Sequence, residues 1–177
     1  NKTFFFFNIQ LLHATNSYAT TNTVYTDSAR KGLWRYVIGG RNGAYLSSNA
    51  AVDASGTPLA SKTIGTYNIA TSDPTGIGLD PAVQKYLAMT PLPNNFTTGD
   101  GLNYAGYTFV APQLEKQVDI TFKLDHNFSP TNAIFVRWAS GHQNTFGDRG
   151  NGGSPAFPGL PNYVDTYRRP RNVAVNW

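Results

Sequence analysis

The chain has 177 residues and a formal net charge of +4 at pH 7, and only 14% of its residues are Asp, Glu, Lys or Arg. Aromatic residues also make up 14%, and there is no cysteine. Such a chain is too aromatic to be disordered and too poor in helix formers to be a helix bundle, and without cysteine it has no disulfide, Cys-ligated zinc or thiol catalysis. The composition predicts a mostly β protein with long polar loops.

The positive charge is scattered along the chain. Its densest cluster, Arg168-Arg169-Pro170-Arg171, is too short for a nucleic-acid-binding stripe, so we expect no nucleic-acid partner. The sequence contains no apolar run near the ~20 residues of a transmembrane helix, and no signal peptide opens it. Both ends fall within candidate strands, so we expect residues 1–177 to be a fragment of a longer protein.

The first predicted strand covers about 3–13. Phe5, Phe7, Ile9 and Leu11 share one parity, and this period-two spacing is typical of a strand. A connection of about a hundred residues, 14–116, follows with little sustained alternation.

Two short helices are predicted within this connection. Thr26 can cap a turn that runs through Arg30 to Gly32. Asp80-Pro81 opens a helix over 82–89, with Val83, Tyr86 and Leu87 on one face. A connection this long is unusual in a compact domain unless the loop itself is functional.

The clearest pattern is a hairpin, with predicted strands at about 117–128 and 134–142. Val118, Ile120 and Phe122 alternate with polar residues, and alternation resumes at Ile134. A four-residue loop would pair Phe128 with Ala133 and put Arg137 on the apolar face. We predict instead a five-residue loop, 129–133, that pairs Phe128 with Ile134 and keeps Arg137 on the polar face. The last predicted strand, about 171–177, follows a Gly/Pro-rich loop, 143–170.

Strands with one apolar and one polar face fit either a soluble β-sandwich or an outer-membrane barrel. One five-residue link lies between two very long ones, which is the asymmetry of short periplasmic turns and long outer loops. Strands of ten to twelve residues also suit a tilted membrane crossing. We therefore predict an all-β fold of antiparallel membrane-spanning strands, a partial outer-membrane β-barrel whose long extracellular loops carry short helices. His126 interrupts the apolar face and should lie near the membrane interface.

Four stretches resemble one family in the same order. Lys2-Thr3-Phe4-Phe5-Phe6-Phe7-Asn8 is similar to the strand after the plug of Oar-like, carboxypeptidase-regulatory-like TonB-dependent receptors. The stretches Leu79–Val83 with Pro91–Asn94, Asp125–Ser129 with Ile134–Arg137, and Phe157–Gly159 with Asn172–Val175 resemble the segments that follow. The chain departs from the family at Ile9-Gln10, at Thr131–Ala133 and over 18–65, which makes transfer of ligand preference unsafe.

The resemblance implies a section of a large plugged barrel in the outer membrane of a Gram-negative bacterium. Its partners would be outer-membrane lipid, TonB acting through a plug that these residues do not include, and an extracellular ligand such as an oligosaccharide, a peptide or a chelated metal. A secreted β-sandwich adhesin or carbohydrate-binding module, and a passive porin, remain alternatives.

Candidate site residues fall into two groups. Asp119, Lys123, Asp125 and Arg137 are predicted to form a charge ladder facing the barrel lumen, with the acids pairing across the hairpin. Trp34, Tyr36, Tyr104 and Tyr107 are the candidates for ligand contact in the outer loops, although packing within the loops is an alternative role. We expect no enzyme activity, cofactor or metal site, since His13, His126 and His142 lie on separate elements without clustered acids.

Overall fold

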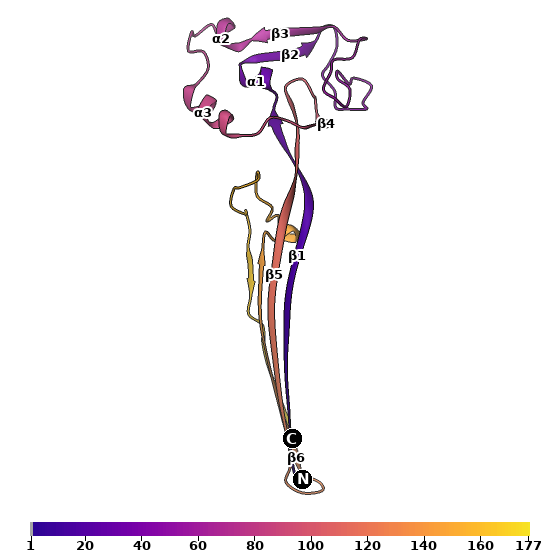
Figure 1. The fold of residues 1–177 in the computed structure, drawn as a ribbon, viewed down its shortest axis with the longest axis vertical. Coiled ribbons are helices and arrows are strands. Elements are labelled where there is room, and N and C mark those ends of the chain that lie inside the picture. The colour runs from indigo at the N-terminus through magenta and orange to yellow at the C-terminus, as the bar shows by residue number, and fades with distance from the viewer. Residues whose placement is uncertain (1) are drawn as a thin grey trace. The chain divides into compact units, whose positions relative to one another are not determined.

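A computed structural model describes residues 2–177, which form long antiparallel strands and a few short helices (Figure 1). The strands are β1 (Thr3–Tyr25), β2 (Leu33–Val37), β3 (Ile64–Asn68), β4 (Asn95–Gly99), β5 (Tyr104–Asn127), β6 (Ala133–Phe146), β7 (Thr166–Arg168) and β8 (Arg171–Asn176). The helices are α1 (Asp27–Arg30), α2 (Ile69–Ser72) and α3 (Pro81–Met89), with a 3-10 turn η1 (Arg149–Asn151). None of the helices in residues 2–177 is long and apolar enough to cross a membrane.

The main sheet has the order β1-β5-β6-β7, with β8 also on β6 and β4 on β5, and a second sheet pairs β2 with β3. Figure 1 shows β1 beside β5. Thr3 Oγ1 lies 2.8 Å from His126 Nδ1, and Thr21 Oγ1 lies 2.8 Å from Thr108 Oγ1. Thr21 lies as many residues after Thr3 on β1 as Thr108 lies before His126 on β5. The two strands are therefore antiparallel, and their register is the same at both contacts.

The β5–β6 hairpin runs without a break from Leu114 opposite Phe146 to Asn127 opposite Ala133. The predicted pairing of Phe128 with Ile134 is wrong: His126 lies opposite Ile134, and the five-residue loop is 128–132. Its ends close where the Phe128 amide donates to the Asn132 carbonyl at 2.9 Å. The shift is two residues, so parity is retained and Arg137 stays on the polar face, as predicted.

Three strands are longer than predicted. One is β6, which continues past 142 to Phe146, so the predicted loop 143–170 is wrong at its start. The expected connection 14–116 was wrong at both ends, because β1 continues beyond His13 to Tyr25 and β5 already begins at Tyr104. The predicted last strand, about 171–177, corresponds to β8, and a further short strand, β7, precedes it. β7 and β8 pair with β6 in the same register, and the Gly141 amide donates to the Pro170 carbonyl at 2.8 Å between them. They behave as one edge strand interrupted where proline has no N–H to donate.

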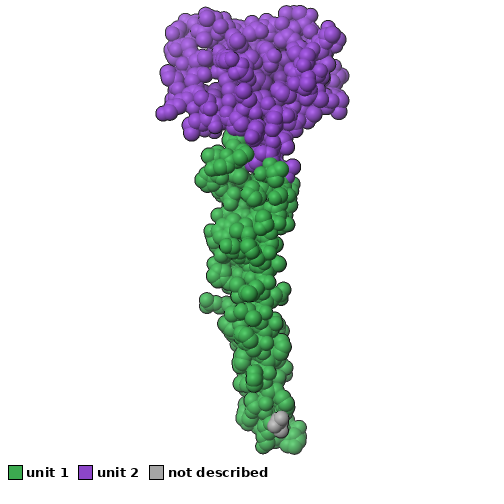
Figure 2. All heavy atoms as spheres, viewed as in Figure 1, with its two compact units in different colours: residues 1–18, 110–177 green, residues 19–109 purple. Residues whose placement is uncertain are grey.

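The chain divides into two compact units (Figure 2). Unit 1 contains the residues up to Tyr18 and Val110–Trp177, and unit 2 is Ala19–Phe109. Unit 2 has a small core of Val37, Ala51, Val52 and Leu102, against which Ile64 packs. Unit 1 leaves large apolar side chains exposed, including Phe5 at 78% and Leu11 at 71%.

Helices α1 and α3 of unit 2 begin at the predicted caps, whereas α2, which Asn68 caps, was not predicted. Thr26 Oγ1 accepts the Ala29 amide of α1, and Asp80 Oδ1 accepts the Ala82 amide of α3 at 2.7 Å. The predicted apolar face of α3 is not buried as one surface: Val83 and Tyr86 are exposed, whereas Leu87 is half-buried.

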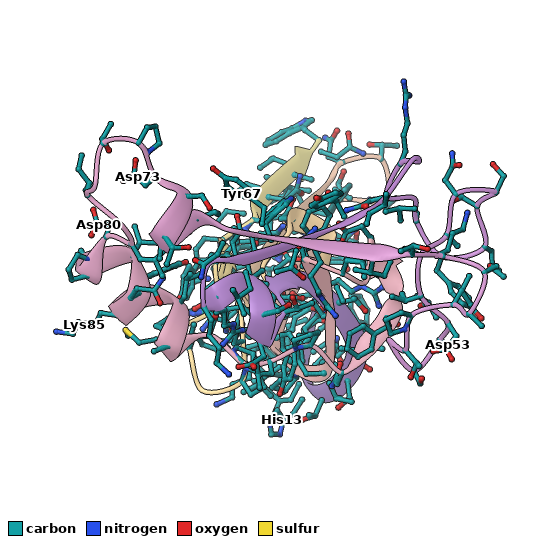
Figure 3. All side chains as sticks on the ribbon, turned by 90° about the horizontal axis from the view of Figure 1, so that it is seen from above. His13, Asp53, Tyr67, Asp73, Asp80 and Lys85 are labelled. Carbon is teal, nitrogen blue, oxygen red and sulfur yellow. The ribbon has the colours of Figure 1, made fainter. Side chains whose placement is uncertain are left out.

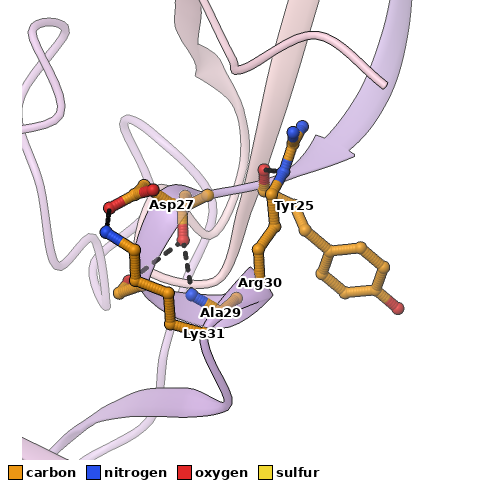
Figure 4. Close-up of polar contacts among 7 residues, drawn as sticks. Tyr25, Asp27, Ala29, Arg30 and Lys31 are labelled. Atoms are coloured by element: carbon orange, nitrogen blue, oxygen red, sulfur yellow. Dashed lines mark hydrogen bonds and ion pairs between the residues drawn. The ribbon is translucent and has the colours of Figure 1, made fainter. Parts of the chain in front are cut away.

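Arg30 joins α1 to the end of α3. Figure 4 shows its Nε bonded to the Tyr25 carbonyl, at 3.0 Å. Its Nη1 donates to the carbonyls of Leu87 (3.1 Å) and Thr90 (2.7 Å), and Nη2 donates to that of Pro91. Burial lowers the pKa of Arg30 from its usual value, and nearby Asp27 acts in the opposite direction. The cation therefore binds three backbone carbonyls at and just beyond the C-terminal end of α3, where a positive charge is favourable.

Candidate functional site

One face of unit 1 carries most of its large apolar side chains. The ladder places Phe122 opposite Trp138, and Trp138 opposite Val173. The constant β1–β5 register adds Phe7 beside Phe122, which completes an apolar row across the four strands. We call this surface the apolar face. It comprises the odd-numbered residues of β1, β7 and β8 and the even-numbered residues of β5 and β6.

Aromatic pairs lie at both ends of the apolar face. Near the short turn, Phe128 stacks on Trp177 with ring centroids 5.7 Å apart. At the other end, Phe146 meets Tyr167 edge-on at 6.0 Å. Ten residues of the edge strand separate Trp177 from Tyr167, which is about 34 Å along a strand. A tilt of about 35–45° reduces this to a height of about 24–28 Å, close to the ~25 Å apolar band between the aromatic girdles of outer-membrane barrels.

The opposite face carries the predicted charges, but they pair differently from the prediction. Lys123 Nζ lies 2.9 Å from Asp125 Oδ1 on the same strand and 5.2 Å from the Phe135 ring centroid. Arg137 lies directly opposite Lys123 and, within residues 2–177, makes no ion pair. The predicted register would have put Arg137 opposite Asp125. The observed register differs from it by two residues, so this cross-strand pair does not form.

Asp119 lies further along the same face, away from the other three charges. Its carboxylate accepts a hydrogen bond from the Gln117 side-chain amide. Gly141 is opposite Asp119, and a β-carbon on Gly141 would meet Asp119 Oδ1 at 2.8 Å. The four residues therefore form a pair, a lone cation and a separate carboxylate rather than a continuous ladder.

Near the short turn this opposite face is also aromatic. Phe4 and Phe6 are 50% and 55% exposed. A hollow of about 410 Å³ is lined by Phe6, Thr121, Lys123, Phe135, Arg137 and Ala174. Both faces of the ribbon therefore present Phe side chains at this end.

The connection between β6 and β7 folds back onto this opposite face. The Arg149 guanidinium lies 4.6 Å from the Tyr18 ring centroid, and the Arg149 amide donates to Gln113 Oε1 at 3.3 Å. Asp148 anchors the connection, accepting the Thr166 hydroxyl at 2.6 Å and the Asn151 amide at 2.7 Å. These hydrogen bonds lower the pKa of Asp148, which favours its charged form.

A buried polar cluster organises unit 2. Asp100 Oδ1 accepts the amides of Leu102 and Asn103 at 3.0 and 2.8 Å. Asn103, which is fully buried, accepts the Arg35 amide at 2.8 Å and donates to the Arg35 carbonyl at 2.8 Å. This cluster fixes the β4–β5 turn against β2. Sequence reasoning missed it, although Gly-Asp-Gly at 99–101 was a turn signal.

The structure brings together some of the aromatic candidates. The rings of Trp34 and Tyr104 are tilted, with centroids 6.4 Å apart. Tyr36 shares the Trp34 face of β2, and Tyr67, which Figure 3 labels on β3, lies opposite Trp34. Sequence reasoning missed Tyr67. Tyr36, Tyr67 and Tyr104 are 44%, 48% and 37% exposed. We call Trp34, Tyr36, Tyr67 and Tyr104 the aromatic platform.

Tyr107 belongs to a different environment. Its ring stacks on Phe109 with centroids 5.9 Å apart. Tyr104 instead borders a hollow of about 340 Å³ with Thr23, Val24 and Tyr25. The structure thus separates Tyr107 from the other three predicted candidates.

An open antiparallel sheet with a lipid-compatible apolar face and aromatic rims is the architecture of a section of a membrane β-barrel. The whole chain, residues 1–177, matches the family described as an outer membrane beta barrel domain. The protein belongs to that family and is located in the bacterial outer membrane. No curated protein and no solved structure matches the chain.

Proposed function

We propose that this chain is the barrel section of a plugged, TonB-dependent importer, with its apolar face toward lipid and its opposite face toward the lumen. The observation that carries this proposal is the aromatic character of the opposite face near the short turn. The exposed Phe4 and Phe6, and the half-buried Phe135 that lines the hollow, would face water in an open channel, whereas the lumen of a porin is polar. A protein domain inside the barrel would cover these rings.

Charge on the same face supports an inserted domain. Asp125 neutralises Lys123, which leaves Arg137 as a surplus cation beside the Phe6 hollow. A carboxylate from a plug domain would pair with Arg137. In the importer, this plug would receive the mechanical energy delivered by TonB, as the family resemblance implies.

Conductance of the intact protein separates an importer from a passive porin. We expect the full-length receptor in a planar bilayer to show no steady open channel, and its periplasmic face to bind the purified periplasmic domain of TonB. A steady conductance without TonB binding would show that the protein is a passive porin and not an importer. Labelling of Phe6→Cys by a water-soluble maleimide gives an independent readout: slow labelling is expected in the intact receptor and fast labelling after deletion of the plug.

We further propose that the aromatic platform contacts the extracellular ligand. Three exposed Tyr rings beside the half-buried Trp34, all with polar tips, suit stacking on sugars or peptide side chains. Replacing Trp34 and Tyr104 with Ala in the full receptor should lower the affinity for a bound oligosaccharide or peptide. Tyr107→Ala is the matched control, because Tyr107 stacks on Phe109 instead. Unchanged affinity in the double variant would remove the platform from ligand binding.

A further inference from the structure

We propose that Arg169 and Arg171 on the apolar face bind phosphate groups of lipids in the outer leaflet. The inference rests on the lipid-facing orientation proposed above and is independent of transport. It concerns the densest basic cluster of the sequence, Arg168-Arg169-Pro170-Arg171, for which neither the barrel nor the importer provides a role.

The strand register separates these arginines onto two faces. Arg168 lies opposite Gln143, on the face that carries Asp119 and Lys123. Arg171 lies opposite Ser140, on the face of Trp138 and Val173. Arg169 shares the parity of Arg171, and both are exposed.

Position along the strand puts both arginines toward the outer rim. From the short turn outward, the apolar-face residues of the edge strand are Trp177, Val175, Val173, Arg171, Arg169 and Tyr167. Tyr167 forms the outer aromatic pair with Phe146. Arg171 is therefore about 13 Å along the strand from the outer rim and Arg169 about half that. Both side chains are long enough to extend their guanidinium groups toward the headgroups while their stems remain in hydrocarbon.

Other basic groups lie on the same face at this level. His142 lies opposite Val118, and Lys116 lies two residues before Val118 on the same face of β5. The β1–β5 register puts His13 opposite Lys116. Lys116, His142 and His13 are exposed; Figure 3 labels His13. Lys116 extends the positive surface to β5, and the two histidines add polar side chains to it on β1 and β6.

Acidic side chains that could neutralise this surface lie elsewhere. Within residues 2–177, the strands of unit 1 contain three acids, Glu115, Asp119 and Asp125, and all three are on the opposite face. Asp165, close to Tyr167, is occupied in the β6–β7 connection, where its Oδ1 accepts the Gly147 amide at 2.8 Å and the Asn162 amide at 3.0 Å.

A guanidinium beside hydrocarbon needs an anionic partner, and its planar fork matches phosphate. Arg169 is already oriented, since its Nη1 donates to the carbonyls of Gln143 at 3.2 Å and Arg168 at 2.8 Å. The partner available on a lipid-facing surface at this depth is the phosphate of a lipid headgroup.

The test compares lipid binding by the full-length receptor and its variants in detergent. The probes are diphosphoryl lipid A and the same lipid after removal of its phosphates, measured by native mass spectrometry. We expect R169Q/R171Q to lower affinity for the phosphorylated lipid roughly tenfold or more, R169K/R171K to retain most of it, and R168Q, the adjacent arginine on the other face, to leave it unchanged. Wild-type protein should bind the dephosphorylated lipid as weakly as R169Q/R171Q binds the phosphorylated lipid.

Several outcomes would overturn the proposal. Equal binding of both lipids by the wild-type protein would do so even if R169Q/R171Q failed to fold. Full binding by R169Q/R171Q would mean that the arginines pair with a neighbouring strand of the complete barrel. Loss of binding in R168Q but not in R169Q/R171Q would instead show that the proposed orientation of the two faces is wrong.

Discussion

Replacing Phe122 with Arg would put a charge near the middle of the apolar face. Phe122 lies in the row of Phe7, Trp138 and Val173, between the two aromatic rims. An arginine at the midplane of the lipid-facing surface of a barrel costs about 2–4 kcal/mol. The matched variant Thr121→Arg places the same charge one residue away on the opposite face, where the cost should stay within about 1 kcal/mol.

The two variants should therefore differ by about 2 kcal/mol in the free energy of unfolding, which is roughly thirtyfold in the equilibrium constant. The assay is reversible folding of the intact barrel into lipid vesicles, followed by tryptophan fluorescence during a guanidinium titration. Equal destabilisation by the two variants, or a larger effect of Thr121→Arg, would refute the assignment of the faces.

Three further predictions concern the connections and the opposite face. Arg30→Gln should weaken local stability of α3 by about 1.5–3 kcal/mol, with a smaller loss for Arg30→Lys, seen as faster amide exchange over 81–89. Hydrogen bonds, first from the Thr75 hydroxyl, lower the pKa of Asp73 to about 2. The folded-state pKa of Asp73 is below its unfolded value of about 3.9, so the ionised carboxylate contributes its full stabilisation of the loop above about pH 3.9. This contribution is lost as the pH falls through about 2. Asp73→Asn should abolish the pH dependence of amide exchange in this loop. Gly141→Ala should destabilise the barrel by about 1–3 kcal/mol, because the new β-carbon would meet Asp119, whereas Gly150→Ala should have little effect.

The sequence revealed the part of the ribbon that has two different faces. Over 117–142, large apolar residues alternate with charged ones, and this contrast correctly predicted the hairpin and the face of Arg137. The exact partner of Phe128 was not predictable in the same way. A shift of two residues exchanges no side chain between faces, so the apolar pattern cannot distinguish the two registers.

The outer half of β1 was missed for a physical reason. From Ala14 to Tyr25 its residues are mostly small and polar on both faces, including Thr15, Thr20, Thr21 and Thr23. The even-numbered face is the more buried one, but it carries residues such as Thr20 and Asn22 instead of a row of large apolar side chains. The sequence therefore shows no apolar alternation there, and pairing with β5 defines the strand instead. The frequent threonines were the remaining local signal, because β-branched residues favour strands.

The candidate site was predictable in composition but not in arrangement. Trp34 and Tyr104 are seventy residues apart in sequence, and they meet because the Asp100–Asn103 turn is bonded to β2. Tyr107 looked equivalent to Tyr104 from sequence alone. Their odd and even positions on β5 direct them to different faces, which the long predicted loop could not show.

The orientation of the two faces can be measured directly by spin labels placed one at a time from Val118 to Leu124 in the intact protein in bilayers. We predict that labels at Val118, Ile120, Phe122 and Leu124 are relaxed by oxygen dissolved in the lipid, and that labels at Asp119, Thr121 and Lys123 are not. The opposite alternation, or accessibility to a water-soluble nickel chelate at the even-numbered positions, would contradict the account.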